Sequence, residues 1–317
     1  MSQAGCLRTL GRESSWRYTF ISIPSRGVIC ICIVSLLLLL LSFCSAKAGF
    51  ERRYSGTRSL STGGTLCAFG EDPWSFYYNP AHASKLNELS AFFIPSVFGI
   101  QEVKSTGIAC RDNLLGIDLG GAVQTFGFEL YRENVFTLNL SVPVYDFLFV
   151  GANANANLLF IKDYGTDFSF SFDAGAKMFL SRNFAIGFTT TNLNSASATL
   201  SGDRLPQTFT GGIAFESDEL NVGLEYFKEL GFPSSVKIAA EYWPVDFIGV
   251  RAGSSSGTNS FNAGLAVRFL SFRFEYGAAF HQLLGVTQSF GISFDLSHDD
   301  KPEFQKIEEY RERLRRK

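Results

Sequence analysis

The sequence lacks an excess of positive charge. Its 317 residues carry 28 Lys and Arg against 30 Asp and Glu, and charged residues make up only 18% of the chain. Proteins that bind nucleic acid through phosphate contacts usually show a basic excess, so we expect no nucleic-acid partner. Disordered chains have few aromatic residues. This chain has 33 Phe and 15% aromatic residues in all, which argues for a folded protein.

Histidine and cysteine are also scarce. The three His residues, His82, His281 and His298, stand in no Ser/His/Asp order, and the sequence contains no phosphate-binding loop and no H-E-x-x-H motif. Four of the 6 Cys lie near the N-terminus, which leaves Cys67 and Cys110 far apart and without metal-ligand spacing. We therefore predict that the protein is not an enzyme and has no catalytic residues, no metal and no cofactor. Whether the two cysteines pair in an oxidising compartment stays open.

Only one long apolar run occurs, VICICIVSLLLLLL from Val28 to Leu41. It follows a segment with several Arg and precedes Ala46-Lys47-Ala48, a small-x-small cleavage pattern. About 14 apolar residues is the length of a signal peptide, whereas a transmembrane helix needs roughly 20. We predict that residues 1–48 are a cleavable signal peptide for export to the bacterial outer membrane. An uncleaved anchor is the alternative.

The rest of the chain alternates apolar and polar residues with period two, from about Leu89 to Leu296. The clearest example lies between Thr166 and Leu180. One face carries Phe168, Phe170, Phe172, Ala174, Ala176, Met178 and Leu180; the other carries Asp167, Ser169, Ser171, Asp173, Gly175 and Lys177. Many such segments have about 10 residues or more, which suits a tilted strand that crosses a bilayer better than the roughly 5 to 6 residues of a soluble strand.

The pattern predicts an all-β protein whose residues 88–297 form a transmembrane antiparallel β-barrel of about 14 strands. A secreted β-sandwich is the alternative. Longer connections are expected near Gln101–Asp112, Asn194–Pro206, Leu230–Pro233 and Ser254–Asn259, and tight turns near Gly120, Ser181, Ser217, Pro244 and Ser271. Long loops on one rim and short turns on the other are typical of outer-membrane barrels, in which the short turns face the periplasm.

Charged residues on the polar face are expected to point into the barrel lumen. There they could form a polar network across the barrel, or simply satisfy the polar groups of a closed interior. The residues predicted for this network are Asp173, Lys177, Glu225, Lys237, Glu241, Arg268, Arg273 and Glu275.

A segment before the first strand is rich in aromatic residues and carries the triplet Asn79-Pro80-Ala81. The stretch CAFGEDPWSFYYNPAHAS, residues 67–84, resembles the N-terminal signature of the PorV/PorQ and FadL-like outer-membrane proteins. Later pieces are similar to the same group: Leu205-Pro206 followed by Gly211-Gly212, then Arg251-Ala252-Gly253, then Ala263-Gly264-Leu265 leading to Phe274-Glu275-Tyr276. Locally, Asn79 as an N-cap and Pro80 as a first helical residue would explain the triplet as a capped turn.

The resemblance implies that residues 49–87 form a hatch tucked into the barrel. It marks as hatch motif or ligand contacts Asp72, Trp74, Phe76, Tyr77, Tyr78, Asn79, Pro80 and Ala81. PorV/PorQ-like relatives imply a role in type IX secretion, with secreted cargo or secretion-system proteins as partners besides outer-membrane lipid. FadL-like relatives imply transport of a hydrophobic small molecule, a fatty acid or a hydrocarbon. The short chain and loops favour the PorV/PorQ interpretation, with FadL-like transport as the alternative.

The last residues, 298–317, are highly charged and are expected to form a periplasmic helix that starts near Pro302. Phe304, Ile307, Tyr310 and Leu314 form a narrow apolar stripe on it. The helix is predicted either to be solvated or to dock a partner.

Overall fold

The structure is a computed structural model that describes residues 50, 54–81, 87–114, 117–197, 204–257, 260–296 and 303–316. The chain divides into two units, residues 1–46 and 47–317, and everything that follows concerns the second unit. The predicted signal peptide, His82, His298 and the predicted helix start at Pro302 lie outside the described residues.

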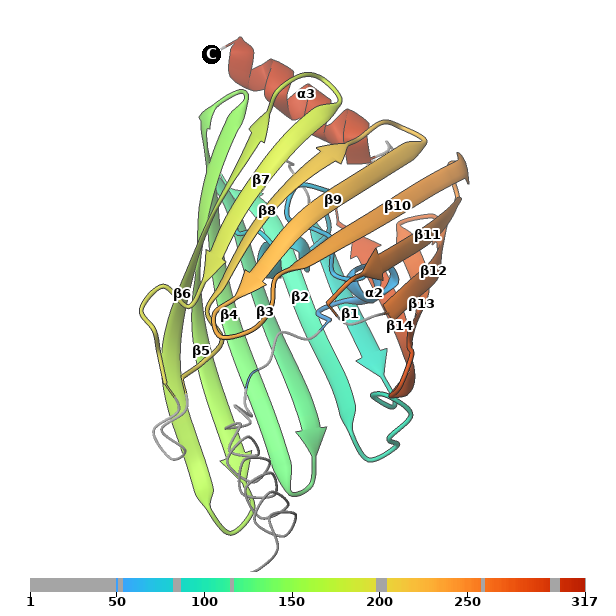
Figure 1. The fold of residues 1–317 in the computed structure, drawn as a ribbon. Coiled ribbons are helices and arrows are strands. Elements are labelled where there is room, and N and C mark those ends of the chain that lie inside the picture. Colours follow the sequence, from blue (N-terminus) through green and yellow to red (C-terminus); the bar gives the residue numbers. More distant parts are fainter. Residues whose placement is uncertain are drawn as a thin grey trace, which may run out of the picture. The chain divides into compact units, whose positions relative to one another are not determined.

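Fourteen antiparallel strands form a closed barrel in which each strand pairs with its neighbours in the chain, and β1 pairs with β14 (Figure 1). This confirms the predicted fold class and strand number. The strands are β1 (Glu88–Ile94), β2 (Lys104–Leu114), β3 (Ile117–Phe128), β4 (Tyr131–Tyr145), β5 (Leu148–Ile161), β6 (Gly165–Phe179), β7 (Phe184–Thr191), β8 (Thr208–Phe215), β9 (Leu220–Glu229), β10 (Ser235–Val245), β11 (Ile248–Ser255), β12 (Ser260–Phe269), β13 (Phe272–His281) and β14 (Gly285–Asp295).

The apolar face of the strands points outward. On β6, Phe170 is 56% exposed, whereas its neighbour Ser171 is 5% exposed. The same alternation runs along the other strands, because successive side chains of a strand point to opposite faces. The outer surface is therefore rich in Phe, Leu, Ile and Tyr, and the lumen is lined by Asn, Ser, Thr and charged residues.

Two predicted connections are wrong. Most of Gln101–Asp112, expected as a loop, belongs to β2, and Gly120, expected in a turn, lies inside β3. Glycine looks like a turn signal in the sequence, but here it makes room for the interior segment: a Cβ on Gly120 would lie 3.0 Å from ring atoms of Phe76. The other predicted connections lie at or next to the observed ones.

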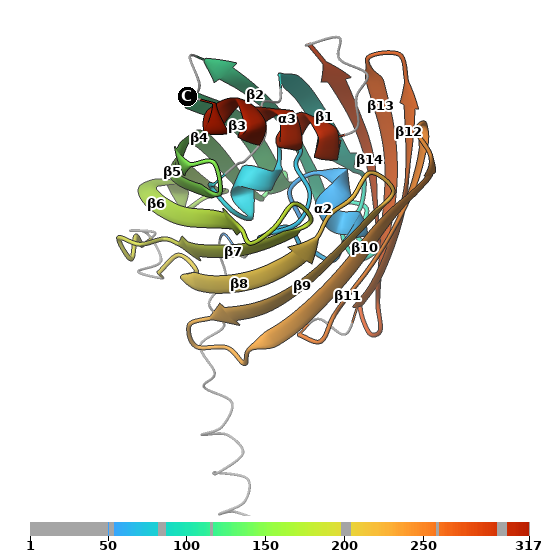
Figure 2. The same cartoon turned by 90° about the horizontal axis from the view of Figure 1, so that it is seen from above.

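Residues 54–81, which we call the hatch, run through the interior of the barrel (Figure 2). They contain one short helix, α2 (Thr57–Ser61), and a single 3-10 turn, η1 (Ser75–Tyr77). Nearly every hatch residue is buried, and α2 packs against strands β11 to β14. The irregular backbone of the hatch is tolerated at this depth because protein surrounds it.

The C-terminal helix α3 (Glu303–Arg315) packs across the end of the barrel that carries short connections such as 146–147 and 180–183, the short-turn rim (Figures 1 and 2). Ile307 and Tyr310 are buried against Phe149 and Phe179. Burial raises the pKa of the Tyr310 phenol to about 12. The apolar stripe is thus covered by the barrel itself. The expectation of a solvated helix is therefore wrong for this face, whereas a partner that docks on the helix stays a prediction.

Among the described residues, no helix is long and apolar enough to cross a membrane.

Candidate ligand-binding site

The hatch is held in the barrel by buried ion pairs. The Glu71 carboxylate of the hatch lies 3.0 Å from the Arg111 guanidinium on β2 and 3.0 Å from the Lys177 ammonium on β6. Lys177 in turn lies 3.7 Å from Glu216, which accepts a hydrogen bond of 2.7 Å from the backbone N–H of Gly70. Two distant strands therefore meet on one hatch carboxylate, and the turn after β8 is joined to them through Lys177 and the Gly70 backbone.

A second buried group of charges is connected to the first through the hatch residue Arg58. Arg58 donates a hydrogen bond to Glu241 at 2.9 Å and another to the Glu71 carbonyl oxygen at 2.9 Å. Arg251 lies 2.5 Å from both Glu241 and Glu275. We call this group the Glu241 cluster; its members are Arg58, Glu88, Glu241, Arg251, Arg273 and Glu275.

The Asn-Pro-Ala triplet anchors the end of the hatch to the barrel wall. The Asn79 amide donates to the Cys67 carbonyl at 2.6 Å and to the Ala176 carbonyl on β6 at 3.1 Å, and its oxygen accepts the N–H of Ala81 at 3.0 Å. The strand glycines beside it permit this approach, because a Cβ on Gly151 would lie 2.1 Å from the Pro80 oxygen. The helix expected after Pro80 falls largely outside the described residues.

The hatch aromatics divide into two groups. Trp74 and Phe76 are fully buried, and the Trp74 indole donates to Ser90 at 3.0 Å and packs edge-on against Phe92. These side chains act in packing. Among the eight hatch residues singled out in the sequence, Tyr77 and Tyr78 line a pocket inside the barrel.

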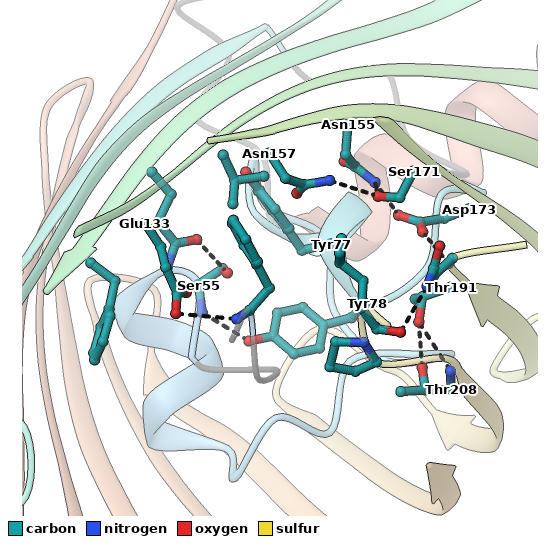
Figure 3. A pocket seen from close by; sticks show the side chains of 17 residues that line it. Ser55, Tyr77, Tyr78, Glu133, Asn155, Asn157, Ser171, Asp173, Thr191 and Thr208 are labelled. Atoms are coloured by element: carbon teal, nitrogen blue, oxygen red, sulfur yellow. Dashed lines mark hydrogen bonds between the residues drawn. The ribbon is translucent and has the colours of Figure 1, made fainter. Parts of the chain in front are cut away.

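This pocket has a volume of about 150 Å³ and lies between the hatch and strands β3 to β8, next to residues 192, 205 and 206 (Figure 3). It is lined by Phe50, Ser55, Tyr77, Tyr78, Gln124, Phe126, Glu133, Val135, Asn155, Asn157, Ser171, Asp173, Thr191, Asn192, Leu205, Pro206 and Thr208. Rings and aliphatic side chains form part of the wall, and amides, hydroxyls and carboxylates form the rest. A concave site of this mixed composition is typical of a small-molecule site.

Hydrogen bonds hold the polar wall of the pocket rigidly. Asn155 donates to Asp173 at 2.8 Å and accepts from Thr137 at 2.7 Å, while Asn157 donates to Ser171 at 3.1 Å. Thr137 is also bonded to the Tyr77 hydroxyl at 3.1 Å.

The charged residues predicted for the lumen have different surroundings in the structure. Glu241, Arg273 and Glu275 belong to the Glu241 cluster, Lys177 binds Glu71, and Asp173 lines the pocket. The contacts of the remaining three include other groups: Glu225 accepts the N–H of Cys67, Lys237 lies over the Phe227 ring, and Arg268 lies over the Trp243 indole.

Sequence reasoning missed the partners Arg58, Glu71, Arg111, Glu216 and Arg251. Alternation along β2 and β11 could have placed Arg111 and Arg251 in the lumen, but the hatch has no period that would orient Arg58 or Glu71.

The two cysteines do not pair. Cys67 is buried in the hatch and Cys110 is exposed on the outer face of β2. Within the described part of the chain, no group of His, Cys, Asp and Glu could hold a metal ion.

Fold and site together define a closed barrel filled by its own N-terminal segment. No protein-family model matches the sequence, and no curated protein matches it. Solved structures do match the fold. The toluene transporter TbuX of Ralstonia pickettii has 15% identity and a TM-score of 0.56, with 76% of this chain and 98% of that chain covered.

Two further solved structures match to a similar degree. For the Pseudomonas putida toluene transporter TodX, the identity is 12% and the TM-score 0.54, with 77% and 97% covered. For a Pseudomonas aeruginosa FadL homologue, the identity is 12% and the TM-score 0.53, with 78% and 100% covered. The chain is therefore FadL-like in fold.

Proposed function

We propose that this protein sits in a bacterial outer membrane and carries small hydrophobic molecules across it. The observation that carries the proposal is the pocket between Tyr77, Tyr78 and the barrel wall, inside a FadL-like barrel. Proteins that share this fold include two toluene transporters. The proposal therefore adopts the transport alternative.

The outer surface supports a membrane location. Outward-facing Phe, Leu and Ile side chains cover the strands. In water, exposing this much apolar surface would cost a large amount of free energy. In a bilayer the same residues contact lipid chains.

The size of the pocket limits its ligand. A cavity of about 150 Å³ in another protein accommodates benzene, so the present pocket has room for one ring but not for an extended fatty acid. Because the hatch fills the lumen beside the pocket, transport requires the hatch to shift after the ligand has bound.

The role in type IX secretion that the resemblance implies stays a prediction. The described residues present no feature that favours cargo handling over small-molecule transport.

Uptake by whole cells tests the proposal. The protein would be expressed in bacterial cells that have no hydrocarbon channels of their own. The initial rate at which these cells take up radiolabelled toluene would then be measured. Val135→Trp places a large side chain in the pocket, whereas Phe136→Trp changes the adjacent residue, which points outward. We expect Val135→Trp to abolish most of the added uptake and Phe136→Trp to retain it. If the two variants behave alike, the pocket is not the route.

A further inference from the structure

Asp173 differs from the acidic residues of the two buried charge groups. Glu71, Glu241 and Glu275 each have a Lys or Arg nitrogen within 3.0 Å. Asp173 is only 8% exposed, yet its hydrogen bonds come from neutral donors. The Asn155 amide donates to it at 2.8 Å.

Two further neutral donors complete its surroundings. The Asn153 amide donates to Asp173 at 3.2 Å, and the backbone N–H of Asn192 donates at 2.9 Å. No described Lys or Arg forms an ion pair with Asp173, so its negative charge is not cancelled locally. A buried charge without a counter-charge is costly, and it acts strongly on anything that enters the space beside it.

Asp173 lines the pocket, so its negative charge acts on molecules inside the pocket. Figure 3 shows Asn155, Asn157, Ser171 and Asp173 along one wall, with Tyr77 and Tyr78 facing them. A carboxylate offers about four lone-pair sites, and Asp173 uses three of them for the bonds described. The wall can therefore accept one more hydrogen bond and repels an anion.

We infer that the pocket selects a ring-sized molecule that carries an O–H or N–H donor, and that Asp173 rejects carboxylates. The inference rests on the proposed transport function and specifies its substrate class. The aromatic side of the pocket would bind the apolar body of the ligand, while the donor would bond to the Asp173 carboxylate. A hydrogen bond to a charged acceptor contributes about tenfold or more in affinity.

Three ligands of one shape test this inference: toluene, 4-methylphenol and 4-methylbenzoate. They differ only in having no polar group, a donor, or a carboxylate. Binding would be measured by isothermal titration calorimetry on the full protein in nanodiscs, with empty nanodiscs as the blank. For the unaltered protein we expect 4-methylphenol to bind at least tenfold more tightly than toluene, and 4-methylbenzoate not to bind.

Asp173→Asn removes the charge and keeps the shape. We expect the ratio of 4-methylphenol to toluene affinity to fall toward one, and 4-methylbenzoate to gain binding. Asp167→Asn is the matched control, because Asp167 is a buried acid on the same strand that does not line the pocket. A second variant, Asn157→Lys, places a cation in the pocket and should admit 4-methylbenzoate even if Asp173→Asn fails to fold.

The outcomes separate the two proposals. Equal binding of 4-methylphenol and 4-methylbenzoate to the unaltered protein would overturn the inference while leaving transport of toluene intact. An unchanged preference in both Asp173→Asn and Asn157→Lys would also overturn it. Failure of all three ligands to bind would contradict the proposed function itself.

Discussion

Glu71 shows how much one side chain contributes to the stability of the fold when it is buried between two cations. Its carboxylate satisfies Arg111 and Lys177 at once, and none of the three is solvated. Removing Glu71 takes the shared counter-charge away from Arg111 and Lys177, and losing one partner of a buried ion pair costs about 3–5 kcal/mol. We therefore expect Glu71→Gln to lower the free energy of unfolding by that amount, measured by urea titration of the barrel in detergent.

Glu309→Gln is the matched control for this change. Glu309 is a helix residue whose side chain is 41% exposed and whose carboxylate lies 3.9 Å from Arg313. Such surface pairs contribute about 0–1 kcal/mol. Equal losses in the two variants would show that the buried position of Glu71 does not matter.

Glycines in the barrel wall provide a second residue-scale prediction. Gly151 touches the Pro80 backbone, so a Cβ there would lie 2.1 Å from a carbonyl oxygen, whereas at Gly211 the nearest atom is 3.5 Å away, in the Phe188 side chain. Overpacking typically costs about 1–3 kcal/mol. Gly151→Ala should lower the melting temperature and make the hatch more sensitive to protease, and Gly211→Ala should leave both nearly unchanged. A protected hatch in Gly151→Ala would contradict the close contact.

At the scale of elements, α3 is a docked helix and not a free one. Ile307 is buried in the cluster with Phe149 and Phe179. Truncating a buried Ile to Ala costs about 2–5 kcal/mol. We expect Ile307→Ala to accelerate hydrogen exchange throughout 303–316, measured by mass spectrometry, while exchange in the strands stays slow. The exposed Arg313→Ala serves as the control, and rapid exchange of α3 in the unaltered protein would show that the helix is not docked.

The strands were predictable from the sequence, whereas the partners of the hatch and of α3 were not. Period-two alternation with an aromatic face over many long segments favours a membrane barrel over a soluble sandwich, and the number of segments gives the strand count. The stripe Ile307–Tyr310 showed that α3 has an apolar face but not which surface covers it. Gly120 was misplaced because a glycine in a turn and a glycine beside a packed ring look the same in a sequence. The neutral donors around Asp173 likewise depend on which strands become neighbours.

For the molecule as a whole, the hatch decides whether the barrel is a pore. Arg58 and Glu71 tie the hatch to the wall through both buried charge groups. With both in place the lumen is filled, so we expect the unaltered protein to show almost no steady conductance in planar lipid bilayers.

Neutralising both hatch charges should loosen the plug without removing the strands that form the wall. The double variant Arg58→Gln, Glu71→Gln should therefore give channel openings that the unaltered protein lacks. The double variant Arg182→Gln, Glu308→Gln removes a pair at the barrel rim, 2.7 Å apart and largely solvent-exposed at Arg182, and should stay closed. Steady conductance of the unaltered protein would mean that ions pass around the hatch, and transport would then need no movement of it.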